Sequence, residues 1–388
     1  MIVRWLFAFV AVLIAAVMGT STYVIVRYPI SDPLVRLSAV VSNYGLFLIP
    51  LGIAGAGLAL LARLRGHAVV RWLGALTALV CVVGAAAAVV PLVASWREAQ
   101  RQGASLSFGE YITAGSNTGS LDPRFGVGYN VVDGRELLLD VKLPSGTSDS
   151  PRPAVVWVHG GGWAEGDRAQ SPRWHEWLNE RGYAVFAIDY RLSPPPRWDQ
   201  APADVKCAIG WVKQHAERYG LDPERVVVAG ASAGGNLALV AAYSDDRVQP
   251  SCAVTDTAVR AVAALYPATD LRAGWHDPDL VAGTRELLRD YTGGTPEQVP
   301  ERYAAAAPVS YVRPGLPPTL LMHGTRDHVV PHAQSAQLAR LLAAAGVAHE
   351  LLSIPYGEHA YDINWGDWGT QLSRHAFDRF LDRHARPN

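Results

Sequence analysis

The chain has 388 residues, with 34 basic and 35 acidic side chains and a formal net charge of −1 at pH 7. At this length, two structural parts are expected. No Lys/Arg-rich run stands out, so nothing indicates a nucleic-acid partner or an acidic partner surface. The cysteines Cys81, Cys207 and Cys252 are widely separated and lack metal-ligand spacing. We therefore expect each to be a small buried apolar residue, and we expect neither a disulfide framework nor a zinc site.

The first hundred residues contain three apolar runs without charge, at about 5–26, 37–62 and 72–95. Each reaches the roughly 20 residues that a helix needs to cross a hydrocarbon core of about 30 Å. Residues 1–96 are therefore predicted to form a membrane module of three transmembrane helices, which makes the chain an integral membrane protein. For the first run alone, a signal peptide is the alternative, although it has no convincing small-x-small cleavage site.

The arginines that flank these runs bear on orientation. One side of the membrane would carry Arg4, Arg63, Arg65 and Arg71, and the other Arg27, Arg36, Arg97 and Arg101. The counts tie, but the compact Arg63-Leu64-Arg65 loop is the densest basic feature, which favours the cytoplasm for its side. An odd number of spans then predicts an extracytoplasmic C-terminal domain.

Residues 97–125 are rich in Gly, Ser, Gln and Thr without helical or strand periodicity, so a linker is predicted there. Residues 126–388 form the predicted catalytic domain, in which apolar runs alternate with helical patterns. A tight Asp133-Gly134 turn joins the first two runs as an antiparallel hairpin. The pattern predicts a mostly parallel eight-stranded sheet with helices on both faces. The expected strands are 128–132, 136–143, 154–159, 184–190, 225–230, 259–266, 319–323 and 349–354.

Ser232 is the candidate nucleophile, in the sequence Gly230-Ala231-Ser232-Ala233-Gly234. This G-x-S-x-G motif follows a predicted strand and precedes a predicted helix, which is the context that a nucleophile elbow requires. Small residues must flank the serine because the backbone folds back sharply there. The helix N-terminus beside it favours a developing negative charge.

A glycine loop, His159-Gly160-Gly161-Gly162-Trp163, follows the third predicted strand. Glycines let backbone N–H groups approach a substrate without obstruction by side chains. We expect the N–H groups of Gly161, Gly162 and Ala233 to form an oxyanion hole, in which each donor is worth roughly 2.7–4 kcal/mol. His159 is expected to organise the loop through hydrogen bonds.

A serine nucleophile needs a base and an orienting acid, which in this kind of fold follow in the order Ser, acid, His. Asp327 follows the seventh predicted strand and His359 follows the eighth. The sequence therefore predicts a triad of Ser232, Asp327 and His359. Asp270, after the sixth strand, is the alternative acid.

Several ordered motifs resemble one family. They are HGGGW, DYRLSPP (189–195), DVKCAIGWV (204–212), GLDPERVVVAGASAGG (220–235) and HGTRDHVVP (323–331). Together they look like the α/β-hydrolase group of hormone-sensitive-lipase-like, feruloyl-esterase-like and kynurenine-formamidase-like proteins. The resemblance covers the chain from about Tyr129 onward. It implies the α/β-hydrolase fold, the same triad and the same oxyanion donors. Ala231 departs from the pattern, since many relatives have Asp there.

The expected activity is hydrolysis of a small-molecule carboxylic ester through an acyl-enzyme, with no metal or organic cofactor. An amidase or peptidase would use the same triad, and a non-catalytic binding protein on this fold is the third alternative. Residues 271–314 are long enough to form a small lid. Four tryptophans are candidates for the walls of an acyl pocket, although aromatic residues are as often plain core: Trp163, Trp198, Trp275 and Trp365.

Overall fold

The computed structural model describes residues 2–28, 31–64, 68–120, 126–146 and 150–385. It divides into two compact units. The first unit comprises Met1–Ala114 and Ile354–Leu372, and the second comprises Gly115–Ser353 and Ser373–Asn388. The segment that carries His359 therefore groups with the N-terminal helices, although it is distant from them in sequence.

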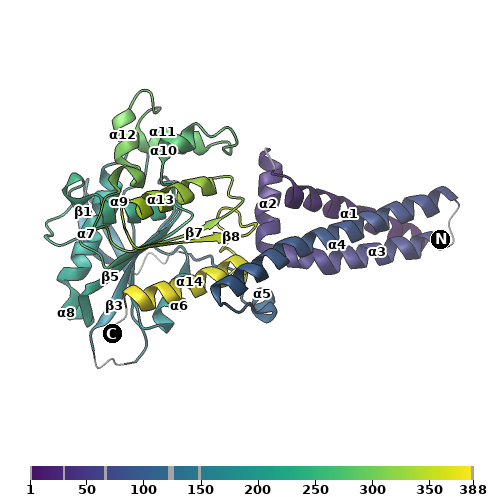
Figure 1. The fold of residues 1–388 in the computed structure, drawn as a ribbon, viewed down its shortest axis with the longest axis horizontal. Helices are drawn as coiled ribbons and strands as arrows, with labels where there is room; N and C mark the ends of the chain where they lie inside the picture. The colour runs from purple at the N-terminus through teal and green to yellow at the C-terminus, as the bar shows by residue number, and fades with distance from the viewer. Residues whose placement is uncertain (1, 29–30, 65–67, 121–125, 147–149, 386–388) are drawn as a thin grey trace. The chain divides into compact units, whose positions relative to one another are not determined.

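The first unit is helical, and its N-terminal helices appear in purple and blue in Figure 1. Helices α1, α3 and α4 pack against one another through small residues. A Cβ atom on Gly55 would lie 2.5 Å from Ile14 Cγ2, and one on Gly84 would lie 2.7 Å from Met18 Cβ. Small residues that let neighbouring helices pack this closely are typical of membrane helix interfaces. The helices are α1 (Ile2–Val26), α2 (Asp32–Tyr44), η1 (Gly45–Phe47), α3 (Leu48–Arg63), α4 (Ala68–Gln102) and α5 (Phe108–Thr113).

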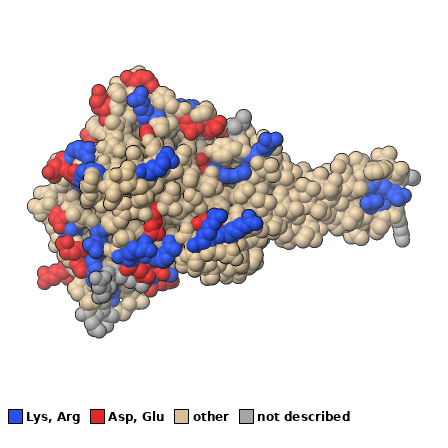
Figure 2. Space-filling view, in the orientation of Figure 1, with Lys and Arg blue, Asp and Glu red and all other residues tan. Residues whose placement is uncertain are grey.

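Three helical stretches of the described chain are long and apolar enough to cross a membrane, namely Trp5–Val26, Asp32–Arg63 and Ala68–Gln102. They correspond to the three predicted runs. On the face shown in Figure 2, these helices present a long surface without charged side chains, with basic side chains towards its ends. Of the basic loop used to predict orientation, Arg65 lies outside the described residues.

The prediction of an irregular linker over 97–125 was wrong in its first half. Helix α4 continues to Gln102, and α5 forms a further short helix. Ser107 caps α5, because its hydroxyl accepts a hydrogen bond from the N–H of Glu110 at 3.2 Å. A helix of six residues is too short to show helical periodicity in a sequence. Its N-cap, Ser107, was therefore the sequence feature that could have predicted it. Residues 121–125 lie outside the described part of the chain.

All eight predicted strands are confirmed within the described residues, and they form one sheet in the order β1-β2-β4-β3-β5-β6-β7-β8. Strands β1 and β2 pair antiparallel, as do β2 and β4. The neighbouring pairs β4–β3, β3–β5, β5–β6 and β6–β7 are parallel. The bounds are β1 (Val127–Val132), β2 (Arg135–Lys142), β3 (Arg152–Val158), β4 (Ala184–Ile188), β5 (Leu221–Ala231), β6 (Ala261–Leu265), β7 (Thr319–Gly324) and β8 (His349–Ile354).

Helices cover both faces of this sheet (Figure 1). Alternate residues of β3, such as Val156, face the core shared with α7 (Gln200–Gln214), α9 (Ala233–Tyr243) and α13 (His332–Ala344). Trp157 points the other way and stacks on Trp174 of α6 (Pro172–Glu180), which in turn packs against Phe377 of α14 (Trp368–His384). Because both faces are buried, the central strands are apolar throughout, as the sequence predicted.

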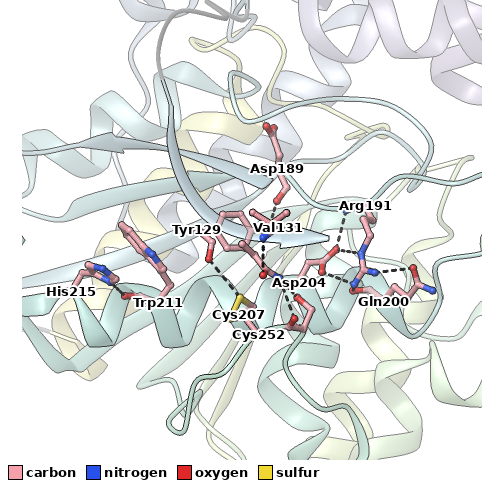
Figure 3. The surroundings of a disulfide bond; sticks show 12 residues. Tyr129, Val131, Asp189, Arg191, Gln200, Asp204, Cys207, Trp211, His215 and Cys252 are labelled. Atoms are coloured by element: carbon pink, nitrogen blue, oxygen red, sulfur yellow. Dashed lines mark hydrogen bonds and ion pairs between the residues drawn. A yellow bond between two sulfur atoms is a disulfide. The ribbon is translucent and has the colours of Figure 1, made fainter. Parts of the chain in front are cut away.

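The prediction that no cysteine pairs was wrong. Cys207 on α7 and Cys252, in the loop before β6, form a disulfide, with their Cα atoms 5.4 Å apart (Figure 3). The loop is also held by the N–H of Ser251, which donates to Ala203 O at 3.0 Å. The two cysteines are 45 residues apart, and no spacing motif in the sequence predicts that they pair. Cys81 is buried and unpaired, as predicted.

Candidate active site

Ser232 occupies the sharp turn between β5 and α9. Its backbone dihedrals are φ 55° and ψ −121°, a conformation that non-glycine residues rarely adopt. The turn is fixed on both sides, since the N–H of Ser232 donates to Leu265 O at 2.9 Å and its carbonyl accepts from Asn236 at 3.0 Å. The sharp strand-to-helix turn that the G-x-S-x-G motif predicted is therefore present in the structure.

The two glycines of the motif are required by packing. A Cβ atom on Gly230 would lie 2.5 Å from Gly234 O, and one on Gly234 would lie 2.2 Å from Val158 O. Both contacts are with backbone atoms, which cannot move aside as a flexible side chain can. Only glycine therefore allows β5, the elbow and the end of β3 to pack this closely.

The glycine loop after β3 is also held in one conformation. Gly161 and Gly162 have φ values of 105° and 58°, in the region that favours glycine. Gly161 O accepts hydrogen bonds from Ala164 and Glu165, both at 3.0 Å. The N–H of Gly160 donates to the side chain of Gln170 at 3.1 Å. Gly161 and Gly162 thus lie in a turn that hydrogen bonds hold in one conformation, as a preorganised oxyanion hole requires.

His159 organises this loop, as predicted. Its Nδ1 lies 2.7 Å from Gly160 O, and its ring stacks on Tyr190 with centroids 4.3 Å apart. The Tyr190 hydroxyl donates to His159 O at 3.2 Å. Burial lowers the pKa of His159, so the ring is neutral near pH 7 and acts as a hydrogen-bond donor to the loop.

Ser232, Ala233, Gly162 and Trp163 line one small cavity of about 40 Å³. Most of the remaining walls come from the predicted lid segment and from the loop after β7, with one residue each from the loop after β6 and from α13, and they are almost entirely apolar. The predicted lid segment contains the helices α10 (Leu271–Trp275), α11 (Thr284–Thr292), α12 (Pro300–Ala305) and η3 (Pro308–Tyr311). The other lining residues are Ala268, Leu271, Gly274, Leu280, Thr284, Leu287, Leu288, Val329, Val330 and Gln334.

Of the four tryptophans considered for the pocket, Trp163 alone is among these lining residues. Its indole donates to Asn236 Oδ1 at 3.2 Å and stacks on Tyr291 of α11, with centroids 4.4 Å apart. Asn236 is fully buried and also donates to Ala268 O and Ala306 O. This residue ties the elbow helix to the glycine loop and the lid. Asn236 was not predictable, because nothing in the local sequence distinguishes it from any polar residue in the interior of a helix.

Asp327 lies in the loop after β7, and its side chain is buried. Its Oδ1 accepts from the N–H groups of Val329 and Val330, at 2.9 and 2.8 Å. Both valines line the cavity. Oδ2 lies 3.2 Å from His323 Nε2. The carboxylate is therefore fixed by the same loop that forms part of the pocket wall.

The rival groups have structural partners. Asp270 caps α10, because its Oδ1 accepts from Ala273 N at 2.9 Å. His323 is buried between Ser335 Oγ and Val330 O, at 2.7 and 2.8 Å, so its ring has structural partners. Asp189 and Asp204 form ion pairs with Arg168 and Arg191, the latter pair visible in Figure 3.

His359 lies in the turn that follows β8 and is half-buried. Tyr356 and Ala360, on either side of it, both have positive φ values, of 59° and 55°. Each such residue costs of order 1–3 kcal/mol and persists only where its surroundings determine the conformation. Among the described residues, no group of three or more His, Cys, Asp or Glu is arranged to hold a metal ion.

The BD-FAE family model matches residues 139–342, just over half of the chain, including the glycine loop, the elbow and Asp327. The chain belongs to the BD-FAE family. This confirms the predicted membership of the α/β-hydrolases and of their feruloyl-esterase-like branch.

Two relatives of this BD-FAE chain come from Mycobacterium tuberculosis. Esterase LipQ is 34% identical over 238 residues, which cover 59% of this chain and 55% of LipQ. Esterase LipC is 32% identical over 257 residues, covering 64% of this chain and 62% of LipC. The chain thus spans little more than half the length of these curated relatives.

The esterase Est2 of Thermogutta terrifontis, solved with propionate and with butyrate bound, is similar in structure. Each of these two forms aligns with a TM-score of 0.57 at 30% identity, covering 68% of this chain and 96% of Est2. The fold that surrounds Ser232 is therefore one that esterases use.

Proposed function

We propose that the protein is a membrane-anchored serine esterase that cleaves carboxylic esters through an acyl-enzyme on Ser232. The observation that carries the proposal is the strained elbow, which holds Ser232 in an apolar cavity beside Gly162 and Ala233. The similarity to LipQ, LipC and Est2, which are named as esterases, supports the same reaction.

In the proposed mechanism, His359 removes the proton of the Ser232 hydroxyl as its oxygen attacks the ester carbonyl. Asp327 holds the imidazole in the correct tautomer and stabilises the imidazolium that forms. The N–H groups of Gly161, Gly162 and Ala233 stabilise the oxyanion. His359 then protonates the departing alcohol, and water hydrolyses the acyl-enzyme by the same steps.

The preferred acyl group is short. The cavity beside Ser232 is small, about 40 Å³, and has apolar walls, which favours an acyl group of few carbon atoms. The propionate and butyrate in the two Est2 structures are acids of this size.

The catalytic domain is proposed to lie outside the cytoplasm, tethered by the three apolar helices. The disulfide between Cys207 and Cys252 supports this side, because disulfides persist in oxidising compartments and are rare in the cytosol. The flanking arginines are equally numerous on the two sides of the membrane. The disulfide is therefore the stronger argument for the side on which the catalytic domain lies.

The reaction class is tested by comparing p-nitrophenyl acetate with a matched aryl amide, on wild type and on Ser232→Ala, Asp327→Ala and His359→Ala. We expect ester hydrolysis by wild type and a loss of at least about 10³-fold in kcat for Ser232→Ala and His359→Ala. Faster cleavage of the amide would favour the amidase alternative. Full activity of Ser232→Ala would exclude a serine mechanism.

A further inference from the structure

We propose that helix α2 of the N-terminal module positions the turn that carries His359, so that esterase activity depends on this helix as well as on the hydrolase fold. The proposal rests on the proposed role of His359 as the catalytic base. It concerns the first unit alone, which contains both α2 and the segment Ile354–Leu372.

The contact begins at the residue next to His359. The hydroxyl of Ser38 donates a hydrogen bond to the carboxylate of Glu358. One helical turn further along α2, Ser42 Oγ accepts from the backbone N–H of Glu358 at 3.1 Å. Ser38 and Glu358 are both buried, with 5% and 2% of their surfaces exposed. Residues four apart lie on one face of a helix, so this face of α2 holds both the side chain and the backbone of Glu358.

A second contact holds the far end of the turn. Asn43 Oδ1 accepts from the backbone N–H of Asn364 at 3.0 Å, and Asn364 Nδ2 donates to Asn43 O at 2.9 Å. The Tyr111 hydroxyl of α5 donates to the same carbonyl at 3.0 Å. Hydrogen bonds from α2 therefore bracket His359, at one position before it and five positions after it.

Helix α5 extends this support to the start of α14. The ring of Trp368 packs against Tyr111 and Phe108, with centroids 4.5 and 5.2 Å apart. Gln371 accepts from Ser107 N at 2.7 Å and donates to Ser107 O at 3.1 Å. The whole segment from Glu358 to Gln371 is thus fastened to helices that the family model does not cover.

These contacts assign a purpose to the polar residues of α2. Buried Ser38 and Asn43 would be costly in a helix that only spans lipid, because polar groups in hydrocarbon need partners. Here they hold a turn whose residues Tyr356 and Ala360 adopt positive φ values. Since a displacement of about 1 Å at a catalytic group can cost roughly 10²-fold in rate, small shifts of this turn would slow the reaction.

The test uses the full chain in detergent, with p-nitrophenyl acetate as substrate and kcat expressed per active site titrated with a fluorophosphonate probe. Ser38→Ala/Ser42→Ala removes both hydroxyls, and the single Ser42→Ala removes the acceptor for Glu358 N alone. Thr20→Ala is the matched control, because within the described part of the chain the Thr20 hydroxyl bonds to carbonyls of its own helix, Ala16 O and Val17 O.

We expect kcat per titrated site to fall about tenfold or more in the double variant and less in Ser42→Ala, with KM unchanged, because the base is displaced while the acyl pocket is intact. Ser42→Thr, which keeps a hydroxyl, should recover activity relative to Ser42→Ala. Thr20→Ala should match wild type. Normalising to titrated sites separates a slower enzyme from a smaller folded fraction.

Two failures are distinguishable. If His359→Ala is inactive but the double variant has the kcat of wild type, the positioning role of α2 is wrong and the proposed triad stands. If His359→Ala retains the kcat of wild type, the base itself has been misassigned. A fall in kcat for Thr20→Ala equal to that of the double variant would also overturn the positioning role.

Discussion

At the scale of single residues, the candidate site depends on the close packing of backbone atoms around Ser232. Ser232 keeps an unfavourable backbone conformation because Leu265 and Asn236 hold its N–H and carbonyl groups. Gly230 and Gly234 are needed because backbone oxygens occupy the space where a side chain would begin. Close packing also limits the size of the pocket, because Leu287 of α11 lies against Gly162. A Cβ atom on Gly162 would lie 2.7 Å from Leu287 Cδ1.

Shortening Leu287 should change which acyl chains the enzyme accepts. Leu287→Ala enlarges the apolar wall beside Gly162, so we expect the ratio of kcat/KM for p-nitrophenyl hexanoate over acetate to rise about tenfold. This follows because each methylene in an apolar pocket is worth roughly 1–3 kcal/mol. Leu341→Ala, an exposed leucine on α13, is the control and should leave the ratio unchanged. An unchanged ratio in Leu287→Ala would show that the acyl group binds elsewhere.

At the scale of elements, the strands and their order along the chain were predictable. Apolar runs and turn residues are local signals, and the G-x-S-x-G and HGGGW motifs lie where parallel strands end. The partners of the turn after β8 were not predictable, since Ser38 and Glu358 are 320 residues apart. The Cys207–Cys252 pairing and the role of Asn236 likewise depend on tertiary contacts that no local pattern records.

Helix α6 carries a buried histidine that should make stability depend on pH. Burial, reinforced by the charge of Lys142, lowers the pKa of His175 well below its usual 6.5, and His175 Nδ1 lies 2.9 Å from Lys142 Nζ. Below pH 6.5 the unfolded chain binds a proton here that the folded chain does not. This group's contribution to stability is therefore complete above that pH and is lost as the pH falls towards the folded pKa, by up to about 1.4 kcal/mol per pH unit.

Replacing the imidazole of His175 should make the stability of the protein less dependent on pH. His175→Asn keeps an acceptor for Lys142 but cannot titrate, so the melting temperature of wild type should fall more between pH 7 and pH 5 than that of the variant. His276→Asn, at an exposed histidine, is the control and should follow wild type. Parallel curves for wild type and His175→Asn would contradict the assignment.

At the scale of the whole molecule, apolar helices and a hydrolase fold occur in one chain, and the proposed extracytoplasmic side of the hydrolase fold rests on the disulfide. Maleimide labelling of the protein denatured directly from its native membranes tests this. Without reductant we expect one reactive thiol, Cys81, and after reduction we expect three, because Cys207 and Cys252 are paired. The Cys207→Ala/Cys252→Ala variant should show one thiol in both conditions. Three thiols without reductant would remove the argument for an extracytoplasmic domain.

The central claim is that Ser232 is an activated nucleophile. Its most direct test is mass spectrometry of the full chain after reaction with a fluorophosphonate probe, with the adduct mapped by peptide. We predict one phosphonyl group on the peptide that contains Ser232, none on Ser232→Ala, and much slower labelling of His359→Ala. A wild-type protein that is not modified at Ser232, or a Ser232→Ala variant that is modified to the same extent as wild type, would contradict the account.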